Sequence, residues 1–189
     1  GLPAGVTGSW AADVATISGT PTEDGTFNYT VTLTGGCGNV TANGSITVTP
    51  EAAITSVTGV SPLCIGGTDT YVANGVVLGG GIGSWSSDNI AIATVDAAGL
   101  VTGVSDGTCN IIYTINGGCG GVKSAQQAVT IDPDNTILLT SAAGTDAQTV
   151  CINNAITDIT YATTGATGAN FAGLPAGVTG SWAADVATI

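Results

Sequence analysis

Apolar and polar residues alternate with a period of two in several short stretches, which clusters of Gly, Asn, Asp and Ser separate. The stretches 25–33 and 107–113 show this alternation most clearly. Their apolar faces hold Phe27, Tyr29, Val31 and Leu33 in the first and Cys109, Ile111 and Tyr113 in the second. Such alternation predicts strands that each bury one face, whereas no long stretch follows the period of a helix. The sequence therefore predicts an all-β protein.

The first 17 residues of the sequence recur as its last 17 residues. Residues 1–17 read GLPAGVTGSWAADVATI, and residues 173–189 repeat them without change, 172 positions later. Near-identical tandem repeats are typical of arrays in which each unit contacts only its neighbours. We therefore interpret the chain as one 172-residue period followed by a 17-residue overlap. A cloning duplication is the alternative interpretation.

A weaker repeat within the period predicts two related modules. Trp10 and Trp85 both follow a Gly-Ser pair, and both precede an Asp and an Ala-Thr strand. Modules of roughly 80–90 residues with many short strands are typical of two-sheet sandwiches. We expect one Trp to fill the core of each module, and the repeat extends this expectation to Trp182.

The repeat also predicts the module boundaries. Residues 51–131 form one complete module, residues 1–49 form the C-terminal part of another, and residues 132–189 form the N-terminal part of the next. The part at residues 1–49 lacks the strands that residues 132–172 of a preceding copy would supply, so it should expose open sheet edges. We expect neighbouring copies of the same repeat to complete these half-modules, in a continuous polymer or in a chain-to-chain assembly.

Two stretches resemble known families. Residues 85–104, WSSDNIAIATVDAAGLVTGV, resemble the bacterial immunoglobulin-like group 2 domain, whose pattern is W-S-S-x-N-x-x-[IV]-A-T-V-[DS]-x-x-G-x-V-T-G. Residues 1–48 carry GLPAGVT, ISGTP and GTFNYTV, and they are similar to immunoglobulin- or PKD-like modules of giant tandem-repeat surface adhesins of Bacteroidota. Such adhesins include gliding-motility adhesins that the type IX secretion route exports.

The resemblance implies a fold and a setting. It implies tandem immunoglobulin-like β-sandwich modules in a repeat array, on the extracellular side of a bacterial cell surface. It also implies a structural stalk or filament that spaces or bundles an adhesive tip. It identifies no ligand, because one fold supports many functions.

Charge and residue types narrow the function. The chain has 189 residues with 13 acidic side chains, a single cation at Lys123 and no His, which gives a net charge of -12. The lack of His excludes imidazole catalysis and His-ligated metals. The negative charge argues against a nucleic-acid partner. No apolar run approaches the roughly 20 residues that span a bilayer, so no membrane insertion is expected. We expect no enzymatic activity and no cofactor.

The five cysteines suggest an oxidising compartment. Matching positions in the two modules predict a disulfide between Cys64 and Cys119, and another between Cys37 and Cys151 across successive repeats. Cys109 is left over and is interpreted as a buried thiol. The alternatives are a reactive or intermolecular thiol, or a Cys64–Cys109 bridge between sheets, as in immunoglobulin domains.

Calcium and carbohydrate are the two ligands that the sequence suggests. Asp132, Asp134 and Asn135 offer oxygen ligands for calcium at a module junction, although a polar turn also explains them. A carbohydrate-binding module, or one for another surface ligand, is the alternative to a stalk. A stalk should bury Trp10 and Trp85, whereas a sugar-binding module should expose at least one of them beside polar side chains in a groove.

Overall fold

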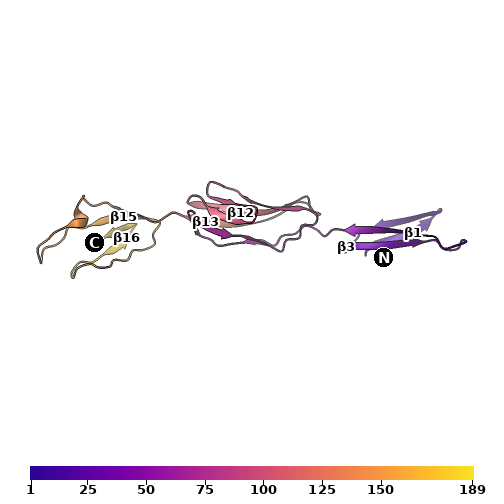
Figure 1. The fold of residues 1–189 in the computed structure, drawn as a ribbon, viewed down its shortest axis with the longest axis horizontal. Helices are drawn as coiled ribbons and strands as arrows, with labels where there is room; N and C mark the ends of the chain where they lie inside the picture. The colour runs from indigo at the N-terminus through magenta and orange to yellow at the C-terminus, as the bar shows by residue number, and fades with distance from the viewer. The chain divides into compact units, whose positions relative to one another are not determined.

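The computed structural model describes all residues from 1 to 189, and the chain is built almost entirely of β-strands (Figure 1). The only helical element is a short 3-10 turn, η1, at Thr145–Ala147. No helix is long and apolar enough to cross a membrane. The prediction of an all-β fold is confirmed.

Seventeen strands follow one another along the chain. The first four are β1 (Val6–Ala11), β2 (Val14–Gly19), β3 (Gly25–Thr32) and β4 (Thr41–Val48). The next nine are β5 (Ser56–Thr58), β6 (Leu63–Cys64), β7 (Thr68–Thr70), β8 (Val72–Asn74), β9 (Ile82–Ser87), β10 (Ala93–Val95), β11 (Leu100–Gly103), β12 (Gly107–Asn116) and β13 (Lys123–Asp132). The last four are β14 (Thr136–Leu139), β15 (Thr160–Thr164), β16 (Ser181–Ala183) and β17 (Val186–Thr188).

The chain forms two compact units. The first contains Gly1–Thr58, Tyr71–Ser86 and Ile111–Gln127, and the second contains Gly59–Thr70, Ser87–Asn110 and Ala128–Ile189. Both units therefore include part of residues 51–131. Each sheet, however, takes all its strands from one of the three sequence stretches 1–49, 51–132 and 133–189.

Two separate hairpins make up the start of the first unit. β1 pairs with β2 from Val6↔Gly19 to Ala11↔Val14, and its two-residue loop has positive φ angles of 47° and 61° at Ala12 and Asp13. This is the geometry of a type I′ turn, whose twist matches that of the strands. β3 pairs with β4 over eight residues. Polar and apolar residues alternate along β3 as predicted, but its apolar side chains are only half-buried.

The core of the first unit lies outside these two hairpins. Its buried apolar side chains are Ala52, Val57, Tyr71, Ile111 and Ile115. Among residues 1–49 only Pro3 is buried. The two hairpins therefore have strand pairing but almost no core of their own.

The second unit contains most of the buried side chains. β7, β11 and β10 form one sheet, and β6 pairs in parallel with the end of β13. Leu63, Ala93, Val101, Cys109, Val129 and Ile131 are buried there. The predicted alternation is confirmed up to Ile111, because Cys109 and Ile111 are buried on the same face of β12, whereas Ile112 and Tyr113 are both half-buried.

A four-stranded antiparallel sheet closes the chain in the order β14-β15-β17-β16. β14 pairs with β15 from Thr136↔Thr164 to Leu139↔Tyr161. β15 also pairs with β17 from Thr160↔Thr188 to Ala162↔Val186. β16 and β17 belong to the second copy of the 17-residue repeat, so this copy has a partner strand that the first copy lacks.

Candidate functional site

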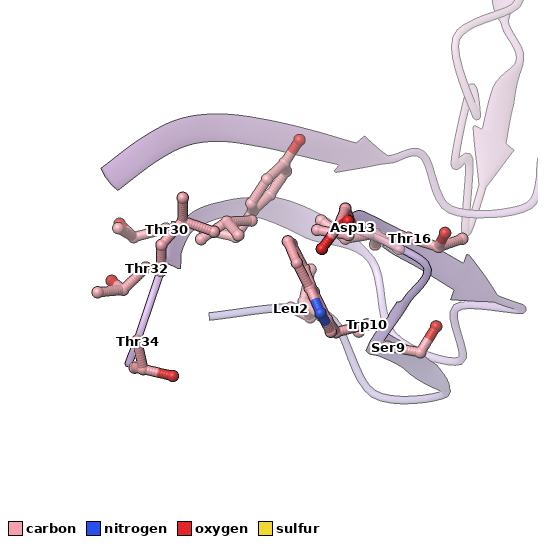
Figure 2. Close-up of a pocket in the computed structure, with 14 residues that line it drawn as sticks. Leu2, Ser9, Trp10, Asp13, Thr16, Thr30, Thr32 and Thr34 are labelled. Carbon is pink, nitrogen blue, oxygen red and sulfur yellow. The ribbon is translucent and has the colours of Figure 1, made fainter. Parts of the chain in front are cut away.

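A groove of about 630 Å³ opens in the first unit among β1, β2 and β3 (Figure 2). Trp10, Asp13 and Thr16 lie along one side of it, and Thr30, Thr32 and Thr34 lie along the other. The apolar face of β3 contributes Tyr29 and Val31 to the lining. The groove is therefore the space between two hairpin faces whose alternating sequence is suited to burial.

Trp10 is the largest side chain in the groove, and 57% of its surface is exposed. The expectation that Trp10 fills a module core is wrong for this chain. The physical reason is the sheet, because β1 and β2 form a two-stranded sheet with no third strand beside β2. Nothing completes the layer that would cover the indole ring.

The polar side chains of the groove carry hydroxyls and one carboxylate. Hydroxyls of Ser9, Thr16 and Thr32 line it together with the Asp13 carboxylate. The Thr30 hydroxyl donates a hydrogen bond of 2.6 Å to Asn43 Oδ1, which links β3 to β4. An exposed indole beside hydroxyls is an arrangement that can stack on a sugar ring.

The second copy of the repeat shows the same hairpin in a different environment. Trp182 pairs with Ala187 in β16 and β17, in the register that Trp10 and Ala15 have in β1 and β2. Trp182 is half-buried, and its Nε1 donates a hydrogen bond of 3.0 Å to Thr163 Oγ1 on β15. The neighbouring strand therefore accounts for the difference between the two indoles.

Other residues of the repeat are also more buried in the second copy than in the first. Ala15 is exposed, whereas its counterpart Ala187 is only 3% exposed. Gly8 faces open space, whereas a Cβ on its counterpart Gly180 would overlap the Phe171 ring. Residues 132–172 therefore cover the second hairpin, and an identical sequence remains open where they are missing.

Trp85 lies in a different kind of site. It is half-buried on β9 and makes an edge-to-face contact with Tyr113, with ring centroids 4.9 Å apart and an angle of 73°. A Cβ at Gly83 would overlap the Tyr113 ring, so the missing side chain at Gly83 makes room for Tyr113. Trp85 therefore packs against an aromatic neighbour and is not part of the groove.

The predicted disulfide between Cys64 and Cys119 is wrong, because all five cysteines are free thiols. Cys64 ends β6 and pairs with Asp132. Cys119 exchanges main-chain hydrogen bonds with Ala52 and Gly79. A disulfide requires Cα atoms within about 7 Å, and matched positions in two sequence modules do not ensure that proximity.

The remaining cysteines have two different environments. Cys37 and Cys151 are exposed, and their pairing across successive repeats stays a prediction. Cys109 is buried on β12, and its Sγ lies 3.7 Å from the Ser87 hydroxyl. The interpretation of Cys109 as a buried thiol is confirmed, and the Cys64–Cys109 bridge is absent.

Asp88 is held by the main chain and side chain of Asn110. The Asn110 main-chain N–H donates a hydrogen bond of 2.8 Å to Asp88 Oδ1. The side-chain Nδ2 of Asn110 donates a second hydrogen bond, of 2.7 Å, to Asp88 Oδ2. These hydrogen bonds to Asn110 lower the pKa of Asp88, because they stabilise the charged carboxylate. The pair connects the residue that follows β9 to the fourth residue of β12, a role that the sequence pattern did not reveal.

The calcium candidates lie at the junction of β13 and β14. Asp132 is the last residue of β13, and Asp134 and Asn135 precede β14. All three side chains are exposed, and no group of three or more His, Cys, Asp or Glu side chains is arranged to hold a metal ion. Calcium binding at this junction stays a prediction.

Sequence reasoning did not identify Thr163, the partner of Trp182. The available signals were the Thr-rich strand at residues 160–164 and the perfect repeat that follows it. Neither signal states which strand pairs with which. The register Thr160↔Thr188 between β15 and β17 is what places Thr163 beside the second hairpin.

Residues 44–126 match the family described as bacterial Ig-like domain (group 2). The match covers less than half of the chain, and it confirms the resemblance inferred from residues 85–104. No curated protein matches the chain. The strand pattern and this match together assign an all-β, immunoglobulin-like fold.

Two solved structures share a distant likeness with the chain. One is an intimin mutant of EHEC O157:H7, with 24% identity and a TM-score of 0.31 over 49% of this chain and 51% of that one. The other is surface layer protein SbsC, domains 4–9, with 18% identity and a TM-score of 0.29 over 91% of this chain and 31% of that one. The chain thus spans about half of the first and under a third of the second.

Proposed function

We propose that this chain is a structural spacer repeat of a bacterial cell-surface adhesin, extracellular, and joined to neighbouring copies in a stalk or filament. The observation that carries the proposal is the repeated hairpin. The same 17 residues form the same turn and the same strand register at both positions, although their surroundings differ. A unit that folds identically wherever it recurs is suited to serial repetition.

The match to bacterial Ig-like domains and the charge support this role. Immunoglobulin-like sandwiches in tandem extend a chain without needing a ligand. A net charge of -12 with one cation opposes lateral association between stalks. The resemblance of residues 1–48 extends the proposal to tandem-repeat adhesins of the gliding-motility type, exported by the type IX route. It includes no nucleic-acid partner and no membrane insertion.

A carbohydrate-binding function is the second candidate, and the exposed Trp10 in its groove favours it. Trp182 supplies the counter-argument, because the same side chain becomes half-buried when β15 lies beside its hairpin. Exposure of Trp10 is therefore explained by an open sheet edge. We infer that the groove is an unfilled part of a module core.

The experiment compares polypeptides that contain one, two and three 172-residue periods. A stalk predicts that the maximum dimension from small-angle X-ray scattering increases by an equal step with each period. Two sandwiches with strands of roughly 11 residues at about 3.3 Å each give a step of roughly 70 Å. Folding back into a compact particle would contradict the spacer function.

The sugar-binding candidate has its own test. A glycan array probed with the chain, with Trp10→Ala and with Trp85→Ala separates the two functions. Glycan binding that Trp10→Ala abolishes while the fold persists would favour carbohydrate recognition. The spacer function predicts no glycan signal that depends on either Trp.

A further inference from the structure

The edge of β2 is an interaction surface that the chain itself leaves unpaired. β2 pairs with β1 on one side, and no strand of the chain pairs with its other side. Val14 is 58% exposed on this strand, and Trp10 stands open beside it. An exposed strand edge with apolar neighbours is a template for pairing with another chain.

The occupant that fits this edge is visible in the second copy of the same sequence. There β15 pairs with β17 through Thr160↔Thr188, Tyr161↔Ala187 and Ala162↔Val186. The main chain adds a hydrogen bond of 2.7 Å from the Thr163 N–H to the Asp185 carbonyl. Because residues 1–17 and 173–189 are identical, the edge of β2 presents the same groups to a partner strand.

Apolar side chains on the partner strands are also left uncovered. Ile137 on β14 pairs with Thr163, so the two share a face of the sheet with Trp182. Ile137 is 68% exposed on that face. The groove in the first unit offers Tyr29 and Val31 on the apolar face of β3. Both β14 and the groove of the first unit therefore expose apolar side chains that a partner strand or sheet could cover.

We propose that β14 and β15 of a second copy of this chain dock along β2 and complete an immunoglobulin-like module with residues 1–49. The docked strands keep the register of the second hairpin, with Ala15 opposite Tyr161 and Val14 opposite Ala162. The indole of Trp10 then donates its hydrogen bond to Thr163 of the second copy. The groove is filled by protein and not by a small ligand.

The chain also contains the competitor for this docking. β17 already occupies β15 in the same molecule, where its effective concentration is on the order of millimolar. At low protein concentration the hairpin at residues 173–189 therefore caps β15. Displacement of this cap joins residues 1–49 of one copy to β14 and β15 of another, and such head-to-tail contacts generate open filaments instead of closed dimers.

The test uses the full chain with Ala187→Arg. Ala187 is buried between strands, so an arginine there should release the cap from β15 while leaving Ala15 unchanged in the other hairpin. Sedimentation should then show concentration-dependent species of two or more copies, whereas the unaltered chain stays monomeric at the same concentrations. Hydrogen exchange should show new protection at Val14–Gly19 in those species.

Two matched variants distinguish docking from aggregation. Ala15→Arg with Ala187→Arg should be monomeric, because Ala15 is exposed in this chain but lies in the proposed interface. Thr7→Arg with Ala187→Arg carries the same charge at a position exposed in both copies, since Thr7 and Thr179 are both exposed, and it should still associate.

Two results would overturn the proposal. One is an Ala187→Arg chain that keeps its β-sheet circular dichroism and stays monomeric. The other is equal association of Ala187→Arg with and without Ala15→Arg. The proposal rests on the spacer function for its setting, but either result would leave the length increments of the multi-period polypeptides unaffected. The two ideas therefore fail separately.

Discussion

The Nε1 of Trp182 lies 3.0 Å from the Thr163 hydroxyl, which accepts its hydrogen bond. Trp10 occupies the same place in an identical sequence and is 57% exposed. Local sequence therefore determines the hairpin and its turn, whereas burial of its indole is determined by a strand from outside the repeat. The two copies serve as internal controls for each other.

The contribution of this pair should be measurable. Trp182→Phe and Thr163→Val each remove the hydrogen bond, and each should lower the free energy of opening around β15 by about 1 kcal/mol. Hydrogen exchange of amides in Thr160–Thr164 reports that opening directly. Trp10→Phe is the matched control and should leave those amides unchanged. If Trp10→Phe and Trp182→Phe lowered the protection of these amides equally, the hydrogen bond between Trp182 and Thr163 would not be its source.

The glycines of the repeat offer a second matched pair. A methyl group at Gly180 would overlap the Phe171 ring, whereas the space around Gly8 is open. Gly180→Ala should therefore destabilise the last sheet by about 1–3 kcal/mol through overpacking. Gly8→Ala should change stability by no more than about 0.5 kcal/mol, as exposed substitutions usually do. Urea unfolding followed by residue-resolved exchange separates these effects.

Acid should weaken the link between Asp88 and Asn110. The pKa of Asp88 is lowered in the folded chain by its hydrogen bonds to Asn110, so its stabilising effect is present above the unfolded pKa, near 3.8. That effect is lost as the pH falls through the lower folded pKa. Asp88→Asn should therefore be less stable than the unaltered chain at pH 7, and the difference should shrink below about pH 4. Thermal unfolding between pH 2 and pH 7 measures it, and a pH-independent difference would argue against the pair.

The thiols should react in two classes. Cys37, Cys64, Cys119 and Cys151 are exposed, and Cys109 is buried beside Ser87. Iodoacetamide should label the four exposed thiols in the folded chain and label Cys109 only after denaturation. Mass spectrometry of the labelled peptides gives the answer. Protection of Cys64 and Cys119 that a reductant reverses would restore the disulfide between them.

Much of the strand pattern could be predicted from the sequence, because alternation has a local cause. Burial alternates along residues 25–32 and 107–111 as the sequence predicts, and Cys109 is buried on the face that the pattern assigned to it. The resemblance at residues 85–104 is likewise confirmed by the match at residues 44–126. These features depend on short stretches of chain.

The remaining features depend on strand pairing across long separations. The exposure of Trp10 depends on the absence of a strand beside β2, which no local pattern contains. The Cys64–Cys119 prediction relied on matched sequence positions, and these do not give a distance between Cα atoms. The link between Asp88 and Asn110 requires the register of β9 against β12. The contact between Thr163 and Trp182 likewise requires the pairing of β15 with β17.

We infer that residues 1–49 and residues 132–172 are complementary parts of one repeated module. The sharpest test is hydrogen exchange on a polypeptide of two full periods followed by the 17-residue overlap, which contains three copies of the hairpin. Its internal copy has residues 132–172 before it and a copy of residues 18–49 after it. If the two parts are complementary, the internal hairpin should be more strongly protected than the first and last copies, and its Trp should be buried. Equal protection at all three hairpins would contradict it.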